Sequence, residues 1–213
     1  MRIFLVTLLA GLGVTFSLPG HADPKTHMRL DWAKSSETDF VTVVVGDYSP
    51  SPESNYLLNA SWGRIYSDTL FGLPIPMSAN LGLQYFKERD YQGDGYGVTA
   101  YIKAHYDWDL PWTDLNLRLG LGEGLSYVSV IPMSEQRDFA KKDAESAHVL
   151  NYLEWTVDLP LEQFAALQPM FQNGAIEQMS VGFTVWHRSS VFGLMGTEKG
   201  GVNFMGFGVE ARF

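Results

Sequence analysis

The sequence of 213 residues contains no cysteine, which excludes disulfide bonds and thiolate metal ligands. Basic residues are scarce: 15 lysines and arginines face 24 aspartates and glutamates, giving a net charge of −9. A chain with this balance lacks the basic surface that binds phosphate backbones, so no nucleic-acid partner is expected. After residue 22 there is also no apolar run of the roughly 20 residues that a transmembrane helix needs.

The start of the chain has the order of a secretory signal. Arg2 supplies a positive charge, residues 3–16 are almost all apolar, and Gly20-His21-Ala22 places small residues at a cleavage site. We therefore predict a signal peptide at 1–22 and one domain at 23–213. An N-terminal anchor helix is the alternative interpretation, although the apolar run is short for a bilayer span.

The composition of the remaining chain suits strands that face two different solvents. Aromatic residues make up 14% of the sequence, charged residues only 18%, and there are 21 glycines. This combination is typical of transmembrane β-barrels. A soluble acidic β-sandwich shares part of it, so composition alone does not decide the fold.

Alternation with a period of two supplies the deciding signal. In the last twelve residues one face is mostly apolar and ends at the C-terminal Phe213, while the other carries small and charged groups such as Glu210 and Arg212. An alternating last strand with a terminal aromatic resembles the signal that bacterial outer-membrane barrels present to the barrel assembly machinery. We therefore expect that machinery to be a partner of Phe213.

The same period recurs along the chain and predicts an all-β fold. The fold expected is an eight-stranded antiparallel transmembrane barrel in the bacterial outer membrane, closed because lipid cannot satisfy a free sheet edge. Clear strands are expected near 78–85, 98–108, 115–122, 148–159 and 202–213, and fainter ones near 40–48, 56–66 and 178–190.

A barrel of eight strands is only wide enough for side chains to fill. The inward-facing positions carry charges of both signs, which we expect to pair with one another: Lys103, His105, Asp107, Arg118, Glu154, Asp158, Glu210 and Arg212. A filled lumen makes a porin or an internal ligand carrier a poor candidate.

With both ends of the barrel chain on the periplasmic side, the longer loops face outward. The outer loops are expected at 49–55, 89–96, 131–146 and 190–200. Residues 109–114 predict a short inner turn, and 161–171 a short periplasmic helix.

One pair of residues indicates chemistry. His187 and Ser189 are two residues apart, so in a strand they share a face, and their parity is that of the apolar residues Val181, Phe183 and Val185. A polar pair facing lipid costs free energy without a structural return. It favours a nucleophilic serine with a histidine base. The alternative is a polar rim where the strand leaves the membrane.

The end of the chain resembles the lipid A 3-O-deacylase family. The resemblance covers about 181–213 and depends on the His-x-Ser of this strand, a carboxylate in the last outer loop, the Gly-Gly-x-Asn at 200–203 and the terminal aromatic. It implies an eight-stranded outer-membrane esterase, with its triad on the barrel exterior and lipopolysaccharide as the lipid partner. The implied roles are nucleophile for Ser189, base for His187, orienting acid for Glu198 and oxyanion donor for Asn203.

The resemblance implies no cofactor and no metal. The sequence departs from the family pattern in two places: Ser190 stands where an asparagine usually follows the serine, and Glu198 lies closer to that serine than the family glutamate does. Glu123, on a face that is otherwise apolar, is an alternative acidic member.

Two function hypotheses follow. The chain is either a lipid A deacylase-like ester hydrolase or a non-catalytic outer-membrane barrel. The second would act in surface interaction or membrane stability through the loop at 131–146.

Overall fold

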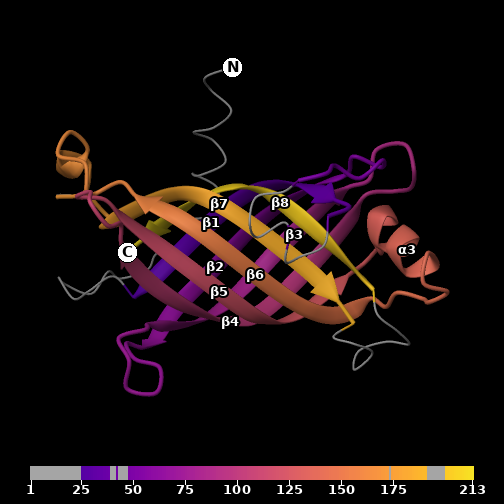
Figure 1. Ribbon diagram of the computed structural model, residues 1–213, viewed down its shortest axis with the longest axis horizontal. Coiled ribbons are helices and arrows are strands. Elements are labelled where there is room, and N and C mark those ends of the chain that lie inside the picture. The colour runs from indigo at the N-terminus through magenta and orange to yellow at the C-terminus, as the bar shows by residue number, and fades with distance from the viewer. Residues whose placement is uncertain (1–24, 39–41, 43–47, 173, 191–199) are drawn as a thin grey trace.

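Eight antiparallel strands close into one barrel in the computed structural model, with each strand paired to its sequence neighbours and the last paired back to the first (Figure 1). The structure describes residues 25–38, 42, 48–172, 174–190 and 200–213. The strands are β1 Thr26–Ser36, β2 Tyr56–Ser67, β3 Met77–Lys87, β4 Gly95–Asp109, β5 Asn116–Val128, β6 Val149–Pro160, β7 Gln178–Ser189 and β8 Gly201–Arg212. The predicted fold class is confirmed. The expected signal peptide lies outside the described residues.

The position of the first strand is a correction. The strand expected near 40–48 lies mostly outside the described residues, and the first place in the barrel is taken by β1 at Thr26–Ser36. Its outward side chains include the apolar Met28, Leu30 and Trp32, but its inward ones include Arg29 and Asp31. Because of these charged residues, a search of the sequence for apolar segments does not find this strand.

Period-two alternation separates an apolar exterior from a polar interior. Large apolar side chains stay exposed on the outside of every strand, as expected of a surface that contacts lipid; examples are Leu30, Leu83, Ile102, Leu121 and Phe207. Within the described residues no helix is long and apolar enough to cross a bilayer.

Charged and aromatic side chains fill the lumen. Arg29 is its central cation: the guanidinium donates to Asp31 at 2.6 Å, to both carboxylate oxygens of Asp158 at 2.8 and 2.9 Å, and to Thr184 at 2.6 Å. Lys103 pairs with Glu154 at 2.6 Å, which also accepts bonds from Tyr152 and Trp186. The predicted pairing of lumen charges is confirmed, and Arg29 and Asp31 join it.

The closing seam between β8 and β1 brings two backbones close together. Gly206 lies opposite Ala33, and a Cβ at position 206 would stand 1.9 Å from the carbonyl oxygen of Trp32. Glycine is required at this position because a side chain would displace the β1 backbone. Beyond the seam, the backbones of Thr26 and Phe213 exchange two hydrogen bonds, which extends the closure to the C-terminal residue.

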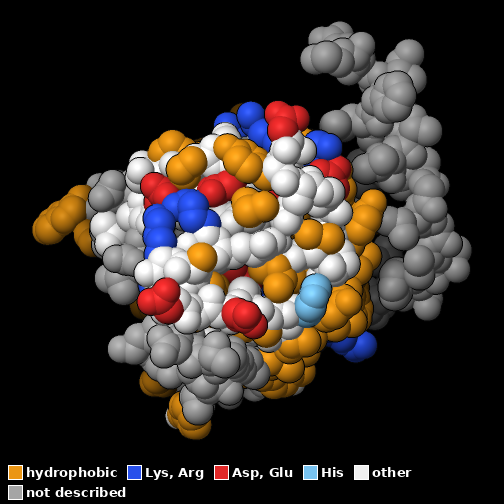
Figure 2. All heavy atoms as spheres, turned by 90° about the vertical axis from the view of Figure 1, so that its right-hand side faces the viewer, with side chains coloured by type: hydrophobic (Ala, Val, Ile, Leu, Met, Phe, Trp, Pro, Cys, Tyr) orange, Lys and Arg blue, Asp and Glu red, His pale blue; other side chains and the backbone are white. Residues whose placement is uncertain are grey.

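A short helix covers one end of the barrel. This helix, α3 at Met133–Ala140, belongs to the loop predicted at 131–146 and lies at the opposite end from the C-terminus (Figure 1). Seen from that end, charged groups of both signs gather over the mouth of the barrel (Figure 2). The longer loops identify it as the outer end.

The inner end agrees only in part with expectation. A turn joins Asp109 to Asn116, as the sequence predicts. The prediction of a helix at 161–171 is wrong. Residues 161–167 form turns, and only Gln168–Met170 are helical, as the 3-10 element η1. Pro169 lacks the backbone N–H that a regular helix would use there.

We expect Arg29→Met to destabilise the barrel by about 3–5 kcal/mol, because it leaves the buried Asp31 and Asp158 without their cation. The matched control is Lys25→Met. Its partner Asp68 is 3.6 Å away and both side chains are at least half exposed, so the loss should be about 0–1 kcal/mol. Denaturant unfolding in detergent, followed by heat-modifiable gel mobility, measures both. Equal midpoints for the two variants would contradict a structural role for the Arg29 network.

Candidate functional site

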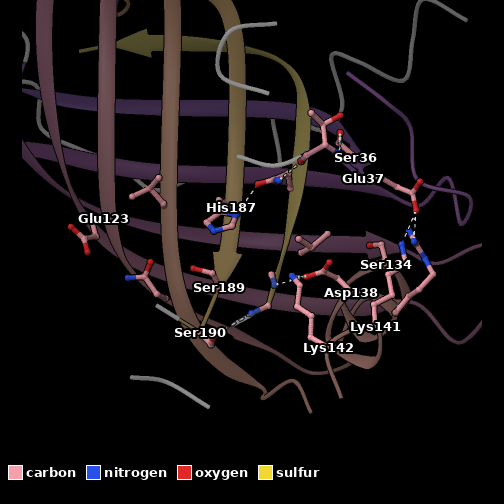
Figure 3. A pocket seen from close by; sticks show the side chains of 18 residues that line it. Ser36, Glu37, Glu123, Ser134, Asp138, Lys141, Lys142, His187, Ser189 and Ser190 are labelled. Carbon is pink, nitrogen blue, oxygen red and sulfur yellow. Dashed lines mark hydrogen bonds and ion pairs between the residues drawn. The ribbon is translucent and has the colours of Figure 1, made fainter. Parts of the chain in front are cut away.

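The register of β7 places His187 and Ser189 on the outside of the barrel. His187 pairs with Leu153 of β6 and Asn203 of β8, and Ser189 pairs with Asn151 and Gly201 on the same two strands. Both side chains are half-buried. Figure 3 shows them projecting from β7 side by side, with the serine beyond the imidazole toward the outer end of the strand.

Asn203 holds the imidazole from the neighbouring strand. Its Oδ1 lies 2.7 Å from Nδ1 of His187, and its Nδ2 donates to the carbonyl oxygen of Thr38 at 2.6 Å. The asparagine is only 6% exposed. The position of the histidine ring is therefore fixed by strand β8, which carries Asn203, and by the segment after β1, which carries Thr38.

Gly201 leaves the space next to this pair. A Cβ at position 201 would lie 3.1 Å from both His187 Cε1 and Ser189 Cβ, and 2.4 Å from the carbonyl oxygen of Arg188. Any larger residue would crowd the imidazole and the serine together, so the glycine keeps the site open.

The pair lies in a pocket of about 400 Å³ at the outer rim of the barrel. One wall is the outward face of β5 to β8, and the other is α3 together with the end of β1. The carboxylate of Asp138 on α3 accepts a hydrogen bond from the backbone N–H of Gly201 at 3.0 Å and pairs with Lys142 at 2.7 Å. Arg137 also lines this pocket. Lys141 lines it as well (Figure 3).

The structure brings together three of the four predicted site residues. His187, Ser189 and Asn203 are neighbours on β7 and β8, whereas Glu198 lies outside the described residues. The amide nitrogen expected to serve an oxyanion is instead bonded to Thr38, and the amide oxygen faces the imidazole. Asn203 thus occupies an orienting position.

Two further candidates, Glu123 and Ser190, lie near the His187–Ser189 pair. Glu123 is outward and lines the pocket, but Leu153 stands between it and His187 in the register, at roughly 10 Å for two strand spacings. Ser190 follows the end of β7 and lines the same pocket, but it is fully buried, and its hydroxyl accepts the N–H of Gly200.

Sequence reasoning missed Thr38, Asp138 and Asn151. The outward parity of Asn151 could have been found, because it is a polar residue two positions before Leu153 on an apolar face. Thr38 and Asp138 come from loops, where no periodicity indicates which way a side chain points.

Ion pairs hold α3 against the barrel mouth. Arg137 donates to Glu53 at 2.6 and 3.1 Å and also pairs with Glu37. Burial by itself would raise the pKa of the Glu53 carboxyl, but the hydrogen bonds from Arg137 outweigh it and hold that pKa below its usual range. Glu135 is fully buried and pairs with Arg188; here burial prevails and the pKa of its carboxyl is raised.

No protein-family model and no curated protein matches this chain. Solved structures do match. The outer membrane enzyme PagL is 11% identical, with a TM-score of 0.57 over 86% of this chain and 97% of its own. Neisserial surface protein A (NspA) is 12% identical, with a TM-score of 0.48 over 88% and 97%. The N-terminal β-barrel domain of Pseudomonas aeruginosa OprF is 14% identical, with a TM-score of 0.42 over 89% and 98%.

At this level of identity the likeness to PagL shows the fold alone. The chain is a closed eight-stranded antiparallel barrel with the fold of bacterial outer-membrane proteins. The outer-membrane location expected from the sequence agrees with this fold and with the apolar exterior.

We expect acid to loosen the contact between α3 and the barrel through Glu53. Because the folded pKa of Glu53 is lowered, its contribution to stability is present above the unfolded value of about 4.3 and is lost as pH falls through the lowered folded value. Hydrogen exchange of the α3 amides, corrected for intrinsic rates, should show protection falling in this window.

The control is Glu53→Gln, in which this acid step should be missing. Glu135 has the opposite sign, since its raised pKa gives a contribution that is lost as pH rises, but it is present in both proteins and cancels in the comparison. Identical protection curves for the wild type and the variant would contradict the role of the Arg137–Glu53 pair.

Proposed function

We propose that this protein is an outer-membrane ester hydrolase that removes an acyl chain from a lipid of the outer leaflet. The observation that carries the proposal is the outward-facing His187–Ser189 pair, held by Asn203 in a pocket at the lipid-facing rim. A polar pair on this lipid-facing surface lowers the stability of the fold, because its groups lose their hydration. A role in nucleophilic catalysis would account for this cost.

The mechanism is serine acyl transfer. The hydroxyl oxygen of Ser189 attacks the ester carbonyl while His187 takes the hydroxyl proton. The imidazolium returns that proton to the leaving alkoxide, and an acyl-enzyme remains. Water, deprotonated by His187, then attacks the acyl carbonyl, and the imidazolium returns the proton to the departing oxygen of Ser189, which releases the fatty acid and the free enzyme.

The position of the pocket supports a lipid as the substrate. The site opens on the barrel exterior, where lipid is the neighbouring phase, while the lumen is filled by paired charges. Arg137, Lys141 and Lys142 line the pocket in ion pairs with Glu53, Glu37 and Asp138, and cations at a membrane surface also attract the phosphates of lipid headgroups. Lipid A, which carries phosphates and ester-linked hydroxyacyl chains, fits these requirements and the resemblance of 181–213.

We expect Ser189→Ala and His187→Ala each to lower the hydrolysis rate roughly 10⁴- to 10⁶-fold, because each removes a member of a unit that acts together. Purified barrel in detergent is incubated with lipid A, and the products are identified by mass spectrometry. The matched control is Ser180→Ala, a buried inward-facing serine near the opposite end of β7, which should leave the product pattern unchanged.

Loss of one hydroxyacyl mass in the wild type and in Ser180→Ala, but not in Ser189→Ala, supports the proposal. An unchanged lipid spectrum from barrel shown to be folded by heat-modifiable mobility contradicts it. That result would favour the non-catalytic barrel, for which deletion of the loop at 131–146 should matter and substitutions at 187 and 189 should not.

A further inference from the structure

We propose that Asn203 is the positioning residue of the site: it orients His187 and fixes which ring nitrogen carries the proton, in place of the loop carboxylate Glu198. The inference rests on the proposed function and completes it. It makes the third member of the arrangement a neutral amide from the adjacent strand.

The first step is the direction of the amide. The nitrogen and oxygen of an asparagine side chain are distinguished by their partners, and the backbone carbonyl of Thr38 can only accept a hydrogen bond. The group 2.6 Å from that carbonyl is therefore Nδ2, which turns Oδ1 toward His187.

The second step concerns the tautomer of His187. An amide oxygen only accepts hydrogen bonds, so Nδ1 of the imidazole must be the donor across the 2.7 Å contact. A neutral imidazole has a single N–H, and its Nε2 is then the unprotonated nitrogen. This is the state that a general base needs before it takes the proton of a serine.

The third step is rigidity. His187 and Asn203 are register partners on two strands of a continuous ladder, and Asn203 is 6% exposed. The third residue is thus held by the barrel wall, and its second bond ties it to the segment after β1. A site built on strands holds its geometry more tightly than one built on a loop.

Other charged groups face the same pocket and bear on any pH dependence: Glu37, Glu123, Arg137, Asp138, Lys141 and Lys142. Among them Asp138 and Lys142 form an ion pair at 2.7 Å. They are unchanged in variants of position 203, so differences between those variants report on position 203 itself.

The first test does not depend on catalysis. Barrel labelled with ¹⁵N in its histidine rings is studied by NMR in detergent, and the signal of His187 is assigned with His187→Gln. We expect neutral His187 to carry its proton on Nδ1 in the wild type. In Asn203→Leu, which has a similar volume but no acceptor, this preference should be lost. A wild-type ring protonated on Nε2 would overturn the proposal whether or not the protein is an enzyme.

The second test uses rates. Asn203→Leu should lower kcat on the order of 10²-fold with KM nearly unchanged, since general-base catalysis contributes about 10²- to 10⁴-fold. Asn203→Asp restores an acceptor and should recover most of this loss. Its negative charge also stabilises imidazolium, so the acid limb of the pH–rate profile should move to higher pH by roughly one unit.

A merely structural asparagine would change the folded fraction in both variants without moving the acid limb in Asn203→Asp. Glu198→Gln should retain the wild-type kcat. If it abolishes hydrolysis while Asn203→Leu does not, the loop carboxylate is the orienting group and the proposal is wrong. If lipid A is untouched by the wild type but the Nδ1 proton is observed, the proposed substrate fails and the assignment of Asn203 stands.

Discussion

In a bilayer every backbone N–H and C=O must find a partner within the protein, because hydrocarbon offers none. The ladder between β8 and β1 meets this requirement, and at Gly206 the two backbones are too close for a side chain. Closure fixes the register of all eight strands, and register fixes which side chains share a face. The pairing of His187 with Asn203 follows from that register and from no local feature of either strand.

Closure with only eight strands also decides where chemistry can occur. The lumen is too narrow for a ligand and is filled by Arg29, Lys103 and their carboxylate partners, with α3 packed over the mouth. A substrate therefore reaches the protein only from the lipid side or at the rim. The pocket that contains His187 and Ser189 lies where these two surfaces meet, so an ester group at the headgroup boundary can approach it.

The strands with a strongly apolar outer face could be predicted from the sequence, because lipid imposes a period of two on each of them. β1 was not predicted because its inward positions hold the charged Arg29 and Asp31, whose further partners Asp158 and Asn59 lie on other strands. His187 and Ser189 could be found by parity alone. The role of Asn203 could not, since the sequence gives its outward face but not the opposing residue or the contact with Thr38. A helix within the loop at 131–146 has no periodic signal, so Asp138 could not be placed beside Gly201 before the fold was known.

A neutral third residue has a physical advantage at this location. A carboxylate buried between two strands at the lipid boundary would lose its hydration, and only a charged imidazole would compensate it. The amide of Asn203 avoids that desolvation and still accepts the Nδ1 proton. The same reasoning explains the pairing of Asp138 with Lys142 and with the Gly201 amide. The negative charge of Asp138 is compensated by Lys142 and by the N–H of Gly201.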